Sequence, residues 1–411
     1  MRVMIVAENA STRFGGEAII PYHYFRLLRA RGVDAHLIVH ARTRDELVSL
    51  FPDDLKHIHF VEDQLLQKIF YRVGKLLPHR VAEATFGLAN QLLTQWAQRR
   101  VIRVLTTKQC VIHQPIPVSP RFPSLLYDLG TPVVVGPLNG GMEYPPAFRD
   151  AESNLSRMII DFGRSFTDVA NAIFPGKRRA AVVLVANPRT TDALPSHLRG
   201  RIMELPENAV DTTQWSCIKA GAEEYADRFV FIGRLVDWKA LDIVIEALVN
   251  VPEATLDVVG DGPMMTAWQE LAQQLGLGTR VRFLGWRTQE QCADYLRNCC
   301  ALVLPSIYEC GGAVVLEAMA MERPVIATAW GGPMDYLDAS CGILIEPTSR
   351  SAMVQGFATA MEQLMKSPEP RAKLGIAGRA RLEQEFDWEA KIDRVTAIYE
   401  SCLDHPTTPS H

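Results

Sequence analysis

The stretch LPSIYECGGAVVLEAMAMERPVIAT occupies residues 304–328 and contains one complete succession of strand, loop, helix and strand. An apolar strand comes first, and a loop with Glu309, Gly311 and Gly312 follows it. A helix is expected from about Gly312 to Met321, and PVIA then begins the next buried strand. A strand followed by a helix and a further strand is the building unit of a parallel sheet.

The same alternation continues on both sides of this stretch. In the second half we expect six strands, near residues 229–233, 255–260, 281–284, 301–304, 324–327 and 342–345. The first half has comparable runs at residues 3–7, 36–39, 133–135 and 182–186. Strands rich in Val and Ile that alternate with helices form doubly wound parallel sheets. The sequence therefore predicts an α/β fold with two such sheets.

A polar segment, LPENAVDTTQW, separates the two halves at residues 205–215. The chain has 411 residues, which exceeds one ordinary domain of about 150 residues. We therefore place a first domain at residues 1–207, a second at 208–384 and a final segment at 385–411. Two such sheets that face each other leave one cleft, and ligands are expected at the carboxyl ends of the strands.

Composition excludes several classes of protein. The chain is 48% hydrophobic and 22% charged, which matches a globular protein and excludes a disordered chain or a coiled coil. No apolar run approaches the roughly 18 to 20 residues that span a bilayer, so we expect a cytoplasmic protein. The eight cysteines show no metal-ligand spacing, and we interpret them as reduced core residues.

Charge is divided unevenly along the chain. Residues 1–205 contain 26 Lys and Arg against 18 Asp and Glu, whereas the remainder contains 17 against 29. The first half is therefore expected to meet something anionic. Its basic residues between 64 and 104 fit peripheral contact with the inner face of a membrane or with a lipid diphosphate acceptor, although solvated helix faces explain them equally well. Nucleic acid is not an expected partner, because no known binding motif accompanies the charge.

Gly311 and Gly312 stand where a helix is expected to begin. Backbone N–H groups there can approach an anion closely, and the helix dipole favours it, so we expect phosphate at this point. Glu317 lies about 7.5 Å farther along the helix, inside the apolar segment AVVLEAMAM. A buried carboxylate is unfavourable without a partner. Glu317 is therefore expected either to accept hydrogen bonds from a ribose or to pair with a neighbouring arginine, while Glu309 in the loop can face a sugar.

Glu309 and Glu317, with seven residues between them, resemble the E-x7-E motif of the retaining family-four glycosyltransferases of the GT-B fold. The resemblance is strong over residues 228–346 and looser before them. It implies two doubly wound parallel-sheet domains that face each other across a cleft. The first would be the acceptor side and the second would bind the nucleotide sugar, with the C-terminal helix returning towards the first domain. It also implies that Glu317 holds the nucleotide ribose and that Glu309 contacts the donor sugar.

The segment FIGRLVDWKALD carries two cations, Arg234 and Lys239, in one loop between a strand and a helix. Together they can neutralise a diphosphate as it leaves. The segment resembles the family's G-R-L-x-x-x-K-G-x-D pattern, with Ala240 where glycine is usual. The alternative is that both cations pair with Asp237 and Asp242. The sequence has no Asp-x-Asp at a strand end, so no metal is expected and the two cations would take its place.

Three further segments resemble loops on the nucleotide side of the family. VVGDGP contains Gly262, and Arg287 follows the segment FLGW where the base pocket is usual. The resemblance implies that both contact the nucleotide. Gly331 and Gly332, which follow the PVIA strand, are expected to shape the backbone instead.

The first half supplies candidates for the opposite side of the site. Gly15 and Gly16 follow the first strand, where backbone amides can meet the diphosphate, although a simple turn is the alternative. His113 stands at a strand end in VIHQPIPVSP, where the resemblance implies contact with the donor sugar or the reacting centre. A core histidine is the alternative there. VVVGPLNGGMEYPP, residues 133–146, is assigned to the acceptor side.

We therefore expect a retaining hexosyltransferase that moves a sugar from a UDP- or GDP-linked donor to the hydroxyl of a sugar or lipid-linked acceptor, in cell-surface polysaccharide or glycolipid synthesis. The resemblance implies attack on the same face, with the leaving phosphate accepting the proton. No cofactor beyond the donor is expected. A nucleotide-sugar 2-epimerase and a non-catalytic nucleotide-sugar-binding protein stay open as alternatives. A dehydrogenase is excluded, because no strand is followed by G-x-G-x-x-G.

Overall fold

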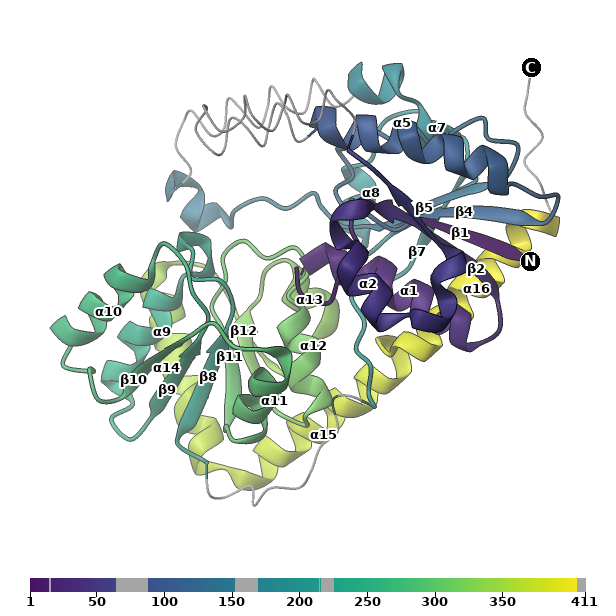
Figure 1. The fold of residues 1–411 in the computed structure, drawn as a ribbon. Coiled ribbons are helices and arrows are strands. Elements are labelled where there is room, and N and C mark those ends of the chain that lie inside the picture. Colours follow the sequence, from purple (N-terminus) through teal and green to yellow (C-terminus); the bar gives the residue numbers. More distant parts are fainter. Residues whose placement is uncertain (15, 64–87, 152–168, 214, 216–224, 405–411) are drawn as a thin grey trace. The chain divides into compact units, whose positions relative to one another are not determined.

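The structure, a computed structural model, describes residues 1–14, 16–63, 88–151, 169–213, 215 and 225–404 (Figure 1). The chain divides into two compact units. The first contains residues 1–141, 157–207 and 391–411, and the second contains residues 142–156 and 208–390. The short segment 142–156 belongs to the second unit, although it precedes the domain boundary that the sequence predicts between residues 207 and 208. The composition of this segment does not predict that it joins the second unit.

The first unit is built on a seven-stranded sheet with the order β3-β2-β1-β4-β5-β6-β7, in which every pair is parallel. The strands are β1 (Arg2–Val6), β2 (Asp34–His40), β3 (Ile58–Val61), β4 (Cys110–Gln114), β5 (Val133–Leu138), β6 (Val182–Val185) and β7 (Arg201–Glu204). The order reverses between β1 and β4. In doubly wound sheets this reversal is where ligands bind, beyond the carboxyl ends of the strands.

Within the described residues, short helices and two longer ones, α1 and α5, lie between the strands of the first unit. They are η1 (Gly16–Ala18), α1 (Ile19–Ala30), η2 (Ala41–Thr43), α2 (Arg44–Leu50), η3 (Pro52–His57), α5 (Leu88–Leu105), α7 (Gly176–Arg179) and α8 (Pro188–Asp192). The last helix of the chain, α16 (Trp388–Asp404), belongs to this unit from Lys391 onward. Figure 1 shows it in yellow, alongside helices that come from the start of the chain.

The second unit is built on a six-stranded parallel sheet with the order β10-β9-β8-β11-β12-β13. The strands are β8 (Arg228–Ile232), β9 (Thr255–Val259), β10 (Val281–Gly285), β11 (Ala301–Leu304), β12 (Val325–Thr328) and β13 (Ile343–Ile345). The chain moves outward from β8 through β9 to β10, returns to β11, and continues to β13 on the other side. The reversal therefore lies between β8 and β11.

Helices follow the strands of the second unit in regular alternation. They are η5 (Pro146–Ala151), η6 (Asp237–Lys239), α9 (Leu241–Ala247), η7 (Leu248–Asn250), α10 (Met265–Gln274), α11 (Gln289–Arg297), α12 (Ala313–Ala320), α13 (Gly332–Tyr336), α14 (Arg350–Lys366) and α15 (Pro368–Glu385). The central strands are apolar on both faces, and Phe229, Val230 and Phe231 are all buried. Such strands are typical of a parallel sheet that helices cover on both sides.

The predicted fold class is confirmed: both halves are α/β units with parallel, doubly wound sheets. Two strands were not predicted. β7 is an edge strand with an exposed pattern, and β3 has only four residues, two of them half-buried. Neither therefore shows the apolar run that marks a central strand. Within the described residues, no helix combines the length and the apolar character needed to cross a membrane.

Candidate functional site

The reversal of the sheet in the second unit brings the loops after β8 and β11 next to each other. The backbone joins them directly, because Ile307 N donates a hydrogen bond to Trp238 O at 2.9 Å. The Arg234–Lys239 segment follows β8, and the loop with Glu309, Gly311 and Gly312 follows β11. Three of the predicted residues, Arg234, Lys239 and Glu309, therefore lie in adjacent loops that follow the two central strands of this sheet.

Lys239 and Glu309 form an ion pair between these two loops. Lys239 Nζ donates to Glu309 Oε2, and the two side chains are only 15% and 12% exposed. Ser306 Oγ lies 3.4 Å from the same carboxylate oxygen. The sequence predicted both residues for the site but not that they bind each other. Their positions are 70 residues apart, and only the strand order shows that the loops meet.

The pairing of Arg234 and Lys239 with nearby aspartates is not found. Asp242 binds Arg350 instead, at 2.6 Å from Nη1. Arg234 is exposed and makes no hydrogen bond or ion pair with any residue that the structure describes. Of the two cations after β8, Lys239 is therefore paired with Glu309, whereas the Arg234 guanidinium has no ion-pair partner among the described residues.

Glycines set the shape of the loop before α12. Gly312 is the N-cap of α12 and has φ +81°, a left-handed conformation that side chains disfavour. Gly332 N donates to Glu309 O at 2.7 Å, and a Cβ on Gly332 would lie 2.1 Å from Gly311 O. A Cβ on Gly331 would lie 2.3 Å from Glu309 O. The pair after β12 therefore shapes the backbone around Glu309, as expected from the sequence.

Glu317 lies on α12, half-buried among apolar neighbours. Its carboxylate makes no hydrogen bond and no ion pair with the described part of the chain, so the predicted alternative of an arginine partner is not found there. Burial raises the pKa of Glu317 to about 7. A carboxyl group in such surroundings retains its full capacity to accept hydrogen bonds from a ligand.

Gly262 and Arg287 occupy the loops after β9 and β10. Gly262 packs against the loop after β8, because a Cβ there would lie 2.3 Å from Leu235 O. Its amide already binds Asp261 Oδ1 at 2.7 Å. Arg287 Nη1 donates to Trp286 O at 3.0 Å, and the Trp286 ring is 69% exposed. Gly262 thus packs closely against Leu235, and the nucleotide contacts of Gly262 and Arg287 stay predictions.

Segment 142–148 overlaps the stretch that the sequence assigned to the acceptor side, but the structure places it in the second unit, beside the loop of Glu309. Trp330 Nε1 donates to Glu143 O at 2.7 Å, and the rings of Tyr144 and Tyr308 lie 5.1 Å apart between centroids. Tyr308 directly precedes Glu309, so this segment packs against the loop of the candidate site within the second unit. The sequence singled out this stretch by its glycines after a strand, but it gave no signal that Tyr144 contacts Tyr308.

In the first unit, the glycine loop after β1 is only partly described. Gly15 lies outside the described residues. Gly16 is exposed, has φ +55° and begins η1. The next residue, Glu17, accepts a hydrogen bond from Val118 N at 3.1 Å, and burial raises its pKa. The left-handed glycine and this bond fit a structured turn, and binding of diphosphate by Gly16 stays a prediction.

His113 is fully buried, and both of its ring nitrogens are occupied. Nε2 lies 2.6 Å from Gly136 O, which can only accept, so Nε2 carries the proton. Nδ1 then accepts from Tyr399 OH on α16, also at 2.6 Å. Burial lowers the pKa of His113 to about 4. Neither ring nitrogen of His113 is therefore available to bind a donor sugar in this structure. The contacts support the alternative of a core histidine that joins α16 to β4.

Two other assignments to the first unit, the acceptor-side segment and the basic residues expected to meet an anion, stay predictions. Asn139, in the segment assigned to the acceptor side, is buried and donates from Nδ2 to Glu207 Oε2 at 2.5 Å, which indicates a structural role. Of the basic residues expected to meet an anion, those between 64 and 87 lie outside the described residues. Arg100 stacks on Trp96, with Cζ 3.8 Å from the ring centroid.

Part of the chain is similar to known proteins. Residues 218–381 match the family described as glycosyl transferases group 1. A lipopolysaccharide core biosynthesis glycosyltransferase from Rhizobium meliloti is 32% identical over 163 residues, which cover 39% of this chain and 46% of that protein. A D-inositol 3-phosphate glycosyltransferase from Mycobacterium avium is 31% identical over 189 residues, covering 44% and 43%. The matched part thus spans less than half the length of these relatives.

A solved structure has the same fold over the whole chain. It is the crystal structure of Anabaena HepE in complex with UDP, with a TM-score of 0.67 and 16% identity, covering 98% of this chain and 100% of that one. At this identity the likeness shows the fold alone.

Proposed function

We propose that this chain moves a sugar from a nucleoside diphosphate sugar to an acceptor hydroxyl, and the match of residues 218–381 to the group 1 glycosyl transferases supports this proposal. The observation that carries the proposal is the arrangement at the reversal of the second sheet. There, the Lys239–Glu309 ion pair joins the loop that also carries Arg234 to the loop before α12, the helix that carries Glu317. Neither Arg234 nor Glu317 has a hydrogen-bond or ion-pair partner among the described residues.

Glu317 is proposed to hold the ribose of the donor. Its carboxylate is desolvated and lacks a protein partner among the described residues, a state that costs free energy until hydroxyl groups donate to it. Two neighbouring hydroxyls of a ribose suit the two oxygens of one carboxylate. This assignment follows the sequence resemblance, and the missing arginine partner supports it.

Arg234 and Lys239 are proposed to bind the diphosphate. A diphosphate carries more charge than a carboxylate, so it can compete with Glu309 for Lys239. The exchange would release Glu309 to accept hydrogen bonds from the sugar. Donor binding would thereby separate the ion pair. Lys239 would then bind the leaving diphosphate, and Glu309 would accept hydrogen bonds from the transferred sugar. Catalysis of the transfer requires positive charge at the leaving group.

We propose that the anomeric configuration is retained, as the resemblance implies. The acceptor hydroxyl would attack from the face that the leaving phosphate occupies, and a phosphate oxygen would accept the hydroxyl proton. The acceptor class that we favour is a sugar or a lipid-linked glycan, reached from the cytoplasm. The similarity to the Rhizobium lipopolysaccharide core biosynthesis glycosyltransferase supports this choice. UDP is the first nucleotide to try, since HepE was solved with it.

A panel of nucleotides tests the proposal. Thermal unfolding is followed with UDP, GDP and ADP, and the matching nucleotide sugars are then incubated with lipid extract and with buffer alone. We expect one diphosphate to raise Tm and one donor to transfer its sugar only when the extract is present. Release of an epimerised free sugar would indicate a 2-epimerase, and a Tm shift without turnover would indicate a binding protein. Either result would contradict the proposed transfer.

A further inference from the structure

A compact group of histidines and one aspartate lies in the first unit, away from the carboxyl ends of the strands. We call it the histidine cluster and define it as Asp34, His36, His57 and His59. Asp34 and His36 are on β2, His57 ends η3 and His59 is on β3. Asp34 is the first residue of its strand, so the cluster is at the amino end of a parallel sheet. Ligand sites of such sheets lie at the opposite end, and nothing in the proposed transfer uses these residues.

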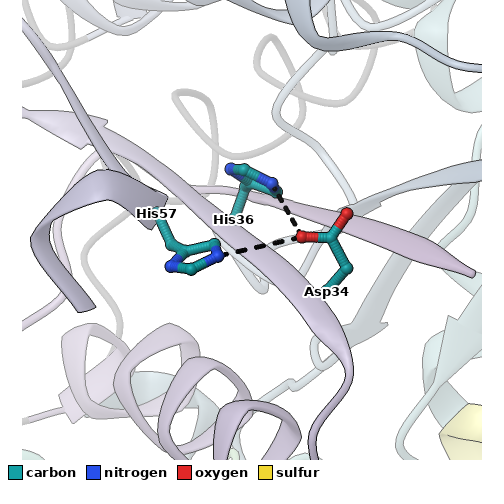
Figure 2. Close-up of side chains that lie close together, drawn as sticks. All are labelled: Asp34, His36 and His57. Atoms are coloured by element: carbon teal, nitrogen blue, oxygen red, sulfur yellow. Dashed lines mark hydrogen bonds and ion pairs between the residues drawn. The ribbon is translucent and has the colours of Figure 1, made fainter. Parts of the chain in front are cut away.

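Three of these side chains converge on one point (Figure 2). Asp34 Oδ1 lies 3.1 Å from His36 Nε2 and 3.9 Å from His57 Nε2. One ligand atom from each of the three residues lies within 4.8 Å of the others. Ligands of tetrahedral Zn²⁺ at about 2.0–2.1 Å from the metal are about 3.4 Å apart. The observed separations bracket this value, so a small adjustment of the side chains brings all three atoms into bonding distance of one ion.

The outward-facing nitrogens of both histidines have acceptors beside them. His36 Nδ1 lies 2.9 Å from His59 Nε2, and His57 Nδ1 lies 3.6 Å from Asp54 Oδ1. His57 Nδ1 is also buried and makes no hydrogen bond that meets ordinary geometry. Histidines that bind metal by one nitrogen donate the other N–H to a carboxylate, carbonyl or similar acceptor. This outer arrangement is independent of the three converging atoms and points to the same ligand.

Charge and access also suit a cation. Arg2 Nε occupies only Asp34 Oδ2, at 2.7 Å, which leaves Oδ1 for the histidines. The nearby Arg29 is compensated by Asp54, with 2.8 Å between Nη2 and Oδ1. The side chain of Asp34 is 42% exposed, whereas those of His36 and His57 are 8% and 11% exposed. An ion could therefore enter from the Asp34 side, where water can complete the coordination.

We propose that Asp34, His36 and His57 bind one Zn²⁺ ion, with His59 and Asp54 as outer hydrogen-bond acceptors and water as the fourth ligand. Imidazole and carboxylate are ligands that suit this metal. Binding would need His36 to carry its proton on Nδ1 and donate it to His59, leaving Nε2 for the metal. The ion would join the amino end of β2 to η3 and β3, and so stabilise the first unit by mass action.

Titration of the chelator-treated full chain with ZnCl2 tests this proposal. The chain is prepared without a polyhistidine tag, because a tag would itself bind the metal. Heat of binding is measured by calorimetry, and metal content is measured after gel filtration. We expect one Zn²⁺ per chain and a rise in Tm that a chelator reverses. Absence of saturable binding by this chain would overturn the proposal.

Three substitutions locate the ion. His57→Asn removes a ligand and is expected to abolish saturable binding, whereas His59→Asn removes an outer acceptor and should weaken binding by about 10- to 100-fold. The matched control is His197→Asn, because His197 is an exposed histidine of the same unit whose left-handed backbone suits asparagine. It is expected to bind Zn²⁺ as the unaltered chain does.

A second variant guards against loss of folding. If His57→Asn does not give a folded chain, Asp34→Asn at the half-exposed position is examined with Co²⁺, whose visible absorption reports coordination by protein ligands. The unaltered chain should show this absorption, and Asp34→Asn should reduce it at least tenfold at equal metal concentration. Equal absorption or equal Zn²⁺ affinity in the cluster variants and in His197→Asn would show that the ion binds elsewhere.

Discussion

Lys239 and Glu309 bind each other across the two loops at the reversal of the second sheet, although both were predicted to bind the donor. Lys239, the cation that we propose to bind phosphate, is thus compensated by Glu309, the acid that we propose to face the sugar. In the proposed site, donor binding breaks this ion pair, so substitutions of the two residues should have different effects on binding and transfer.

Glu309→Gln is expected to strengthen binding of the nucleoside diphosphate while it weakens transfer. Without the carboxylate, Lys239 is available to phosphate, and affinity for the diphosphate should rise about three- to tenfold. Transfer should fall at least about 100-fold, because the charged carboxylate that faces the sugar is replaced by a neutral amide, which is a weaker acceptor. Calorimetry and a product assay measure the two effects. Glu270→Gln, at an exposed glutamate of α10, is the control. Weaker diphosphate binding by Glu309→Gln would contradict the competition.

Nucleotide binding should depend on pH through Glu317. The raised pKa of about 7 means that the free carboxyl group is mostly protonated at pH 6 and mostly ionised at pH 8. Ribose hydroxyls donate best to the ionised form, so binding lowers this pKa, and affinity rises with pH. We expect about tenfold weaker binding at pH 6 than at pH 8. Glu317→Gln should remove this pH dependence. An equal pH dependence in that variant would assign the titration to another group.

The same residue should make the ligand-free protein less stable in alkaline solution. The folded-state pKa of Glu317 is above that of an unfolded chain, so the folded protein binds the extra proton and its stability falls as pH rises from about 4.5 to about 7. Glu317→Gln should therefore raise the free energy of unfolding at pH 8 by about 1 to 3 kcal/mol and change it little at pH 5. Denaturant unfolding at the two pH values measures this. A destabilised variant at pH 8 would show that the carboxylate has an unseen partner.

Gly332→Ala should disturb the loop that carries Glu309. A methyl group there would lie 2.1 Å from Gly311 O, so the backbone must move. We expect a loss of about 2 to 4 kcal/mol in the free energy of unfolding, with loss of transfer. Gly278→Ala is the matched control, because a Cβ at Gly278 meets no atom within 4 Å. Similar stability and activity in both variants would contradict the described packing.

Tyr399→Phe should affect stability without affecting the donor. The substitution removes the hydroxyl that donates to His113 Nδ1 and leaves that buried nitrogen unsatisfied. The expected loss is about 1 to 3 kcal/mol in the free energy of unfolding. If His113 serves only to hold α16, KM for the donor stays unchanged. A large rise in KM for the donor would instead indicate that His113 contributes to donor binding.

The sequence predicted those features of the fold that depend on a local pattern of residues. Apolar runs located the central strands, and the spacing of Glu309 and Glu317 located the β11–α12 loop. It could not show which distant side chains meet. The Lys239–Glu309 pair depends on strand order, and the burial of His113 depends on a helix that begins 275 residues later, at Trp388. The histidine cluster was missed because its members have no metal-ligand spacing and converge only through the register of β2 and β3.

The most direct test compares binding of a nucleoside with binding of its diphosphate. Uridine and UDP, or guanosine and GDP, are titrated into the unaltered chain, Lys239→Gln and Glu317→Gln. The proposed site predicts that Glu317→Gln weakens both ligands, because both carry the ribose, whereas Lys239→Gln weakens only the diphosphate. If Lys239→Gln binds the diphosphate as tightly as the unaltered chain does, or if Glu317→Gln still binds the nucleoside with full affinity, the proposed donor site is wrong.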